Sequence, residues 1–180
     1  IGNSTIMNTF LSKLDYDKFE LVVLSIDHKY RKLLYKEQIN IRNKRKIIFS
    51  DPGSTRQKSS FNSLKKLNKY KIDNVLIHDV ARPFCSNKLI NRILLKLKKF
   101  NNCIPFVEYN DRQVSKSDKK NISAINIQTP QGFNFKIIYE AHKKFKNFSF
   151  SDDAGLIQNL NLKLHLIKGE KTNVKITYPE

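Results

Sequence analysis

The sequence contains only two cysteines, Cys85 and Cys103, and no run that approaches 18 consecutive apolar residues. Two thiols provide neither a disulfide framework nor a zinc site, so we expect a reducing compartment, the cytoplasm. A chain without a long apolar run is not expected to span a membrane. The first residues also lack the basic-then-apolar layout of a secretory signal peptide.

Several catalytic motifs are missing as well. The sequence has neither the G-x-x-x-x-G-K-S/T loop nor the G-x-G-x-x-G fingerprint of common nucleotide-binding proteins. Its four histidines show no metal-ligand spacing, and it offers no convincing Ser–His–Asp or Cys–His set. Chemistry that depends on a nucleophilic triad or a zinc ion is therefore not predicted.

Acidic residues are scarce relative to basic ones: 16 Asp and Glu face 34 Lys and Arg, a formal net charge of +18. A nucleic-acid binder would gather its basic residues on one face, with aromatic residues or glycines between them. Here lysine is spread along every segment beside abundant Asn and Ile, which is typical of a compositional bias. We therefore expect no nucleic-acid partner, although a positive field would attract a small polyanionic substrate.

The 180 residues are expected to form one domain in which strands and helices alternate. Strands are predicted at 20–26, 46–50, 75–77, 103–107, 123–128, 163–167 and 174–177. Helices are predicted at 6–14, 28–38, 57–70, 86–100, 135–145 and 151–160, and a turn at 129–133. This alternation predicts a three-layer α/β/α domain. The polar stretch within 108–128 does not fit a βαβ unit and is predicted to be an arm that pairs with a second subunit.

The first cluster of polar side chains lies where a predicted strand meets a helix, and comprises Gly53, Ser54, Thr55, Arg56 and Ser59. A glycine there lets the backbone approach a ligand, and a helix N-terminus attracts anions. The alternative is a Pro-Gly turn in which Ser54 only caps the helix.

A second cluster, V-L-I-H-D-V-A-R-P-F at 75–84, places Asp79 and Arg82 directly after an apolar strand. Ligands of open α/β sheets bind beyond the carboxyl ends of the strands, so an acid and a guanidinium there suit a metal and a phosphate. The alternative is a surface ion pair on a turn.

Two further features are ambiguous. Lys175 lies in a predicted terminal strand. Its charge either binds phosphate or prevents another chain from pairing with an exposed sheet edge. Ser151, Asp152 and Asp153 precede a predicted helix, and capping alone explains them.

Six segments together resemble the 2-C-methyl-D-erythritol 4-phosphate cytidylyltransferase family of the non-mevalonate isoprenoid pathway. They are I-G-N-S-T-I at 1–6, G-S-T-R-Q-K-S at 53–59, I-H-D-V-A-R-P-F at 77–84, Q-T-P-Q-G-F at 128–133, S-D-D-A-G-L at 151–156 and G-E-K-T-N-V-K-I-T at 169–177. Their order and intervals match the family along essentially the whole chain.

The resemblance implies a Rossmann-like nucleotidyltransferase fold, a homodimer joined through a projecting β-arm, and the use of CTP with Mg2+. A phosphomonoester oxygen of the acceptor, a sugar-alcohol phosphate, would attack the α-phosphate of CTP and release pyrophosphate. Because that oxygen is already ionised, no general base is needed, and catalysis rests on positioning and on cations.

The family's residues carry over by motif. Gly53, Ser54 and Ser59 would lie against cytosine and ribose. Asp79 and Arg82 would hold the acceptor, with Asp79 near the metal. The remaining matches are Thr129 and Ser151, which would contact the acceptor or shape its pocket, and Lys175, the best catalytic candidate.

The sequence departs from the family in two places. The family's Gly-rich loop and its lysine would precede Ile1, so 1–180 is expected to be an N-terminally truncated and inactive fragment. Its C-terminus is a second possible cut, and the sequence leaves open a further domain after Glu180. In the arm, Arg112 follows Asp111 where the family has Thr, and Asn121 replaces an arginine that a neighbouring subunit would lend. Lys119 or Lys120 would supply that charge without the bidentate fork.

These departures leave two alternatives: a cytidylyltransferase acting on ribitol 5-phosphate, which shares the H-D-x-x-R-P turn, and a non-catalytic basic binding module on the same fold.

Overall fold

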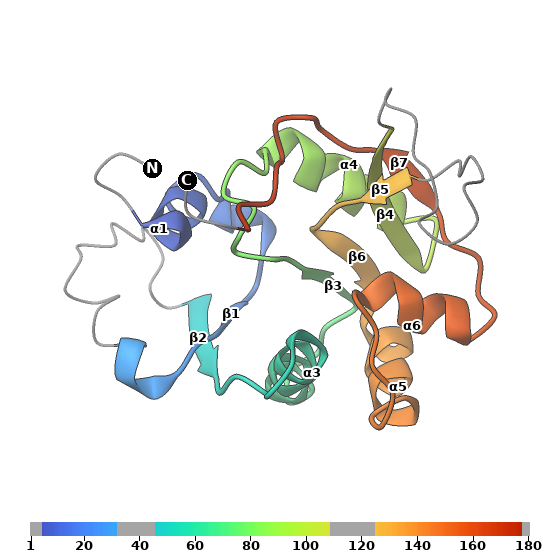
Figure 1. Ribbon diagram of the computed structural model, residues 1–180, viewed down its shortest axis with the longest axis horizontal. Helices are drawn as coiled ribbons and strands as arrows, with labels where there is room; N and C mark the ends of the chain where they lie inside the picture. The colour runs from blue at the N-terminus through green and yellow to red at the C-terminus, as the bar shows by residue number, and fades with distance from the viewer. Residues whose placement is uncertain (1–4, 32–45, 109–124, 178–180) are drawn as a thin grey trace, which may run out of the picture.

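The computed structural model describes residues 5–31, 46–108 and 125–177, in which helices and strands alternate (Figure 1). The helices are α1 (Ile6–Leu11), the 3-10 helix η1 (Tyr16–Lys18), α3 (Arg56–Leu67), α4 (Asn87–Leu97), α5 (Phe135–Lys144) and α6 (Asp153–Asn159). The strands are β1 (Val22–Ser25), β2 (Ile47–Ser50), β3 (Asn74–Ile77), β4 (Asn102–Glu108), β5 (Ile125–Ile127), β6 (Gln131–Asn134) and β7 (Leu166–Lys168).

The described strands form two sheets. A five-stranded sheet has the order β3-β6-β4-β5, with β7 also paired to β4, and a separate parallel pair joins β1 to β2. The large sheet is mixed, because β6 runs antiparallel to both β3 and β4 whereas β7 runs parallel to β4. The continuous apolar run at 75–77 thus belongs to a mixed sheet and not to an all-parallel one.

Helices cover both faces of the larger sheet, which confirms the predicted α/β/α layers. Ile104 packs with Phe133 and with helices α3, α5 and α6 on one face. Its neighbour Cys103 packs against α4 on the other face. Alternate residues of a strand point to opposite faces, so one short apolar stretch supplies both cores. In Figure 1, α4 accordingly lies on the opposite side of the sheet from α5 and α6.

The turn predicted at 129–133 is wrong, because Gln131–Asn134 forms strand β6 in the middle of the sheet. Glycine and proline suggested a turn, yet Gly132 has another purpose. A Cβ atom at Gly132 would lie 2.5 Å from Cγ2 of Ile93 in α4. Glycine in a strand often marks such a close approach of another element.

Three other expectations differ from the structure or lie outside it. Residues 174–177 do not form the predicted strand, although the Ile176 N–H donates to the Ala81 carbonyl at 2.8 Å. The strand predicted at 163–167 is β7, Leu166–Lys168. Only residues 28–31 of the helix predicted at 28–38, and only β5 and the ends of the arm, fall among the described residues.

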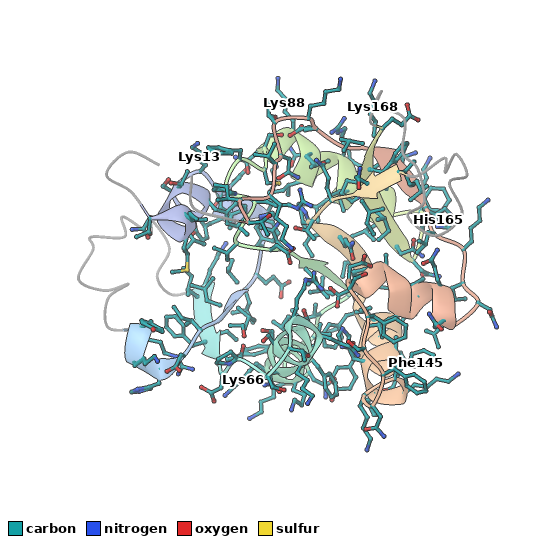
Figure 2. All side chains as sticks on the ribbon, in the orientation of Figure 1. Lys13, Lys66, Lys88, Phe145, His165 and Lys168 are labelled. Atoms are coloured by element: carbon teal, nitrogen blue, oxygen red, sulfur yellow. The ribbon has the colours of Figure 1, made fainter. Side chains whose placement is uncertain are left out.

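Lysines project from several sides of the molecule, as their even spread along the sequence predicts. Figure 2 labels Lys13, Lys66, Lys88 and Lys168, which lie on different parts of the outline. Within the described ranges, no helix is long and apolar enough to cross a membrane.

Both cysteines are buried free thiols, as expected of structural residues. Burial raises the pKa of Cys85 to about 12 and that of Cys103 to about 11. Neither thiol is therefore activated as a nucleophile.

Replacing Phe133 with alanine is expected to lower the free energy of unfolding by about 3–5 kcal/mol, because this side chain is fully buried in the core. Phe148→Ala is the matched control: this residue is 62% exposed, and we expect a change within about 0.5 kcal/mol. Chemical denaturation measures both values, and equal losses would contradict this assignment of the core.

Candidate functional site

The turn between β2 and α3 is built on Gly53. Its N–H donates to the Ser59 hydroxyl at 2.9 Å, and that hydroxyl donates to the Thr55 carbonyl at 3.0 Å. A Cβ atom at Gly53 would lie 2.3 Å from Cβ of Lys58, so the turn requires glycine. Thr55, and not Ser54, caps α3 by accepting from the Lys58 N–H. The structure therefore joins Gly53 to Ser59 and leaves the Ser54 hydroxyl in contact with the Lys58 ammonium at 3.1 Å.

Arg56, the first residue of α3, connects this turn to two carboxylates. Its Nε lies 2.7 Å from Asp79 Oδ1, and its Nη1 lies 2.6 Å from Asp153 Oδ2. Burial alone would lower the pKa of Arg56, but the two carboxylates outweigh it and raise the pKa above its ordinary value. The guanidinium is therefore a permanent cation that joins α3, the end of β3 and α6.

Asp79 follows β3 and is held from three sides. Besides Arg56, its Oδ2 accepts from the Lys175 ammonium at 3.0 Å, and its N–H donates to the Thr129 hydroxyl at 3.0 Å. Burial alone would raise the Asp79 pKa, but Arg56 and Lys175 hold it below its ordinary value. The carboxylate is thus ionised at neutral pH.

His78 precedes Asp79 and contacts two of the residues around it, Arg82 and Thr129. Its Nε2 lies 3.2 Å from the Arg82 carbonyl, its Nδ1 lies 3.1 Å from the Thr129 hydroxyl, and the Phe10 ring packs on it. Removal from water lowers the His78 pKa to about 4, so the ring is neutral at pH 7. Since a carbonyl can only accept, Nε2 carries the proton and Thr129 donates to Nδ1.

Arg82 and Asn173 fix the segment that leads to Lys175. Arg82 Nη1 donates to the Asn173 carbonyl at 2.8 Å, and the fully buried Asn173 donates from Nδ2 to the Thr129 carbonyl at 2.9 Å. The Gln128 side chain accepts a hydrogen bond from the Glu170 N–H at 3.0 Å and donates one to the Glu170 carbonyl at 2.8 Å. These hydrogen bonds therefore hold residues 169–175 at the same rim of the sheet as Asp79.

Lys175 and Ser151 occupy the exposed margin of the site. The Lys175 side chain is 44% exposed while it contacts Asp79. Ser151 is exposed and contacts Asp152 at 3.4 Å, and Asp152 caps α6. The structure thus brings Lys175 directly to Asp79, whereas the Ser151 hydroxyl contacts Asp152 at the start of α6.

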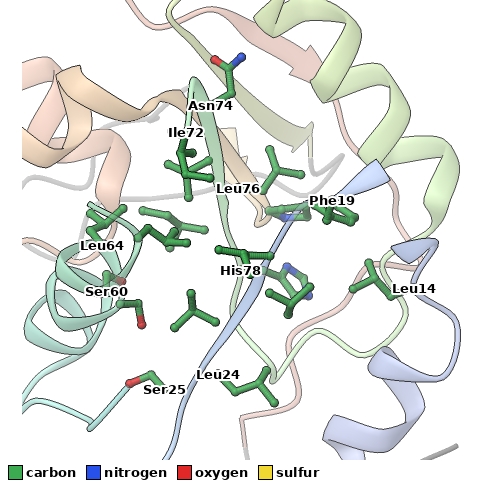
Figure 3. A pocket seen from close by; sticks show the side chains of 18 of the residues that line it. Leu14, Phe19, Leu24, Ser25, Ser60, Leu64, Ile72, Asn74, Leu76 and His78 are labelled. Atoms are coloured by element: carbon green, nitrogen blue, oxygen red, sulfur yellow. The ribbon is translucent and has the colours of Figure 1, made fainter. Parts of the chain in front are cut away.

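A largely apolar cavity of about 590 Å³ lies between β1 and β3 (Figure 3). Its walls come from α1, β1, α3 and β3, with Leu24, Leu64 and Leu76 among the lining side chains. Arg56, His78 and Asp79 also contribute to the wall. The cavity therefore adjoins the polar rim, but its own apolar surface does not suit phosphates.

The described residues do not supply a ready-made metal cage. No three of their His, Cys, Asp and Glu side chains lie together in a way that could hold a metal ion. Both carboxylate oxygens of Asp79 already face cations, Arg56 and Lys175. A metal at Asp79 would have to compete with these ion pairs.

Two members of this site were missed from the sequence: Arg56 received no role, and Asp153 was explained as part of a cap. A signal existed for each. An arginine at the first position of a helix faces the positive end of the helix dipole, which is unfavourable unless acids lie nearby. In Asp152-Asp153 a single residue suffices for the cap, so the second carboxylate was available for another contact.

Taken together, the described part of the rim presents a glycine turn, an ionised carboxylate and three cationic side chains, those of Arg56, Arg82 and Lys175. Such a set can bind and orient phosphorylated ligands and stabilise negative charge that develops between them. It fits phosphoryl or nucleotidyl transfer.

Comparison with known proteins gives a consistent result. A family model described as 2-C-methyl-D-erythritol 4-phosphate cytidylyltransferase matches residues 1–180. The chain is 39% identical over 168 residues to the "Bifunctional enzyme IspD/IspF" of Pelagibacter ubique, a match that covers 90% of this chain and 43% of that protein. It is 32% identical over 189 residues to the 2-C-methyl-D-erythritol 4-phosphate cytidylyltransferase of Clostridium beijerinckii, covering 99% of this chain and 82% of the relative.

Solved structures show the same likeness. The crystal structure of 4-diphosphocytidyl-2C-methyl-D-erythritol synthase from Anaerococcus prevotii has a TM-score of 0.88 at 26% identity, covering 99% of this chain and 82% of that chain. The predicted Rossmann-like nucleotidyltransferase fold is thereby confirmed. The chain spans less than half of the bifunctional relative and about four fifths of the other two proteins.

The low pKa of His78 makes stability depend on pH. Between pH 6.5 and about 4 the unfolded chain binds a proton that the folded chain does not, so the free energy of unfolding falls as the pH is lowered. The full difference is about 3 kcal/mol. His78→Asn should remove most of this dependence, whereas His28→Asn, at an exposed histidine, should keep it. Urea denaturation at pH 7 and pH 4.5 measures the effect, and parallel losses in all three proteins would refute it.

Proposed function

The chain belongs to the 2-C-methyl-D-erythritol 4-phosphate cytidylyltransferase family, and from this premise we propose that the protein transfers the cytidylyl group of CTP to 2-C-methyl-D-erythritol 4-phosphate. A phosphate oxygen of the acceptor forms a bond to the α-phosphorus of CTP. The bond from that phosphorus to the bridging oxygen breaks, and pyrophosphate leaves. The products are the CDP-alcohol and pyrophosphate.

The contact that supports this proposal best is the ion pair between Lys175 and Asp79, 3.0 Å long, at the rim that also carries the Gly53 turn. It places an ammonium with 44% of its side chain exposed where a ligand can reach it. In the proposed reaction Lys175 stabilises the negative charge that accumulates on the phosphate groups, and no residue needs to remove a proton.

The nucleotide is proposed to lie along the turn at 53–59. Gly53 lets this turn lie directly against the first turn of α3, because a Cβ atom there would collide with Lys58 and Ser59. Ser59 holds the Gly53 N–H, and the Ser54 hydroxyl is exposed next to Lys58. These groups suit the polar edges of cytosine and ribose.

The acceptor is proposed to lie against Asp79, with Arg82, Thr129 and Ser151 around it. Thr129 acts by holding the Asp79 N–H, and Arg82 acts partly by holding the Asn173 carbonyl. A carboxylate suits the hydroxyl groups of a sugar alcohol, and the surrounding cations suit its phosphate.

Mg2+ is proposed as the accompanying ion, held mainly by the phosphates of CTP. This ion keeps several waters and needs only one or two protein carboxylates, which suits a site without a metal cage among the described residues. Asp79 is the carboxylate we propose nearest to it. The chemistry that Mg2+ supplies is neutralisation of phosphate charge.

The proposed assembly is a cytoplasmic homodimer without nucleic-acid or membrane partners. The free thiols support a reducing location. The hairpin of β4 and β5 supports the dimer proposal, because it leads into the predicted arm at 108–128.

Pyrophosphate release by the full-length natural protein tests the function. We expect turnover with CTP and 2-C-methyl-D-erythritol 4-phosphate and much less with ribitol 5-phosphate. The reverse preference would replace the acceptor, and no release with either would refute cytidylyl transfer.

In the same assay, Lys175→Ala is expected to lower turnover about 100-fold or more, because charge stabilisation of about 3 kcal/mol is lost. Lys171→Ala removes an exposed lysine from the same segment and should leave turnover within about twofold. Equal rates for the two variants would contradict a catalytic Lys175.

The dimer proposal is tested by replacing residues 109–124 with Asn-Gly. Glu108 and Ile125 are directly paired across β4 and β5, so a two-residue turn closes the hairpin without moving the strands. Light scattering should then report a monomer where the parent is a dimer. A dimer that survives the replacement would place the interface elsewhere.

A further inference from the structure

Arg56 bridges two carboxylates that belong to different parts of the fold. Asp79 follows β3 at the site, whereas Asp153 begins α6 and has a side chain only 1% exposed. The two hydrogen bonds, 2.7 and 2.6 Å, leave from different nitrogens of one planar guanidinium. The position of each carboxylate is therefore linked to the position of the other through a rigid group.

The Asp153 carboxylate, at one end of this bridge, is held in a fixed position by its neighbours. Its second oxygen, Oδ1, lies 2.9 Å from Nε2 of His142, which is equally buried and is stacked on Phe61 with ring centroids 5.6 Å apart. The Ala154 N–H next to it donates to the buried Gln131 side chain of β6 at 3.0 Å. A buried carboxylate with both oxygens engaged and its backbone tied to the sheet cannot move readily.

The Asp79 end is the part that ligands can reach. Arg56 holds Oδ1, which leaves Oδ2 directed at Lys175. Along the chain of contacts His142–Asp153–Arg56–Asp79–Lys175, exposed side-chain fractions are 1%, 1%, 27%, 15% and 44%. The network thus runs from a rigid interior to the two charged groups of the site.

From this geometry we infer that Arg56 is a positioning residue: it transmits the fixed location of Asp153 to Asp79, and through Asp79 to Lys175. It acts on the acceptor side of the reaction and does not itself touch the reacting atoms. This role rests on the proposed function, but the physical link between Arg56 and Asp79 does not.

Lysine cannot replace arginine in this role. Its ammonium is a point charge that can approach one carboxylate well, whereas the guanidinium fork holds both in fixed directions. Arg56→Lys should stay folded, because it keeps a cation beside the buried Asp153 and because Gln57 separately ties α3 to residues 145 and 150 through bonds of 3.2 and 3.0 Å. Arg56→Lys therefore separates positioning from charge and from folding.

The first test is an NMR titration of the Asp79 carboxyl carbon in the chain 1–180, with Arg56→Lys and Arg56→Gln. We expect the Asp79 pKa to rise toward its ordinary value in both variants, more in Arg56→Gln because that change also removes the charge. Arg92→Lys, at an exposed ion pair with Glu170, is the control and should leave it unchanged. An Asp79 pKa that does not move in either Arg56 variant would overturn the inference whatever the enzyme's activity.

The second test uses the full-length protein with separate KM and kcat values for each substrate. Arg56→Lys is expected to lower kcat/KM for the acceptor about 100-fold, since misplacement of positioning groups has effects of that size, while the KM for CTP changes less than about threefold. Equal losses for both substrates, or none for the acceptor, would overturn the positioning role. A wild-type protein without cytidylyl transfer would instead overturn the proposed function, and the titration would still decide whether Arg56 holds Asp79.

Discussion

The rest of the site depends on how the negative charge of Asp153 is accommodated inside the protein. A carboxylate that is 1% exposed must be paired, and its partner Arg56 has to reach it from the first turn of α3. The ion pair therefore ties the first turn of α3, which Thr55 caps, to the start of α6. It also brings Arg56 within 2.7 Å of Asp79. One interior charge therefore sets the relative positions of three elements that lie far apart in the sequence.

The remainder of the rim is held largely by hydrogen bonds from side chains to the backbone. The side chains of Gln128, Thr129 and Asn173 all bond to the main chain of neighbouring segments, including the Asp79 N–H and both polar groups of Glu170, and Thr129 bonds in addition to the His78 ring. Bonds to the backbone do not vary with the side chains of the partner segment. Many surface side chains of this lysine-rich chain could therefore be substituted while Asp79 and Lys175 stay at the same rim.

The alternation of apolar stretches was sufficient to predict the layers, and the family motifs were sufficient to predict which loops meet. Gly132 misled the prediction of a turn, because the local sequence does not reveal that α4 approaches the strand there. Arg56 was missed for a related reason. Its partners are 23 and 97 residues away, so no spacing within a motif reports them. Sequence patterns describe neighbours along the chain, and the errors occurred where distant packing or pairing decided the outcome.

The cavity between β1 and β3 has a mechanical consequence. Among the described residues β1 pairs only with β2, and β3 only with β6, so no ladder of hydrogen bonds crosses the cavity. The cavity of about 590 Å³ is partly open, so its apolar walls are not sealed by the described residues. Across this gap the two sheets are therefore held together by side chains and not by backbone hydrogen bonds. Any apolar group that occupied the cavity would make the domain stiffer and less compressible.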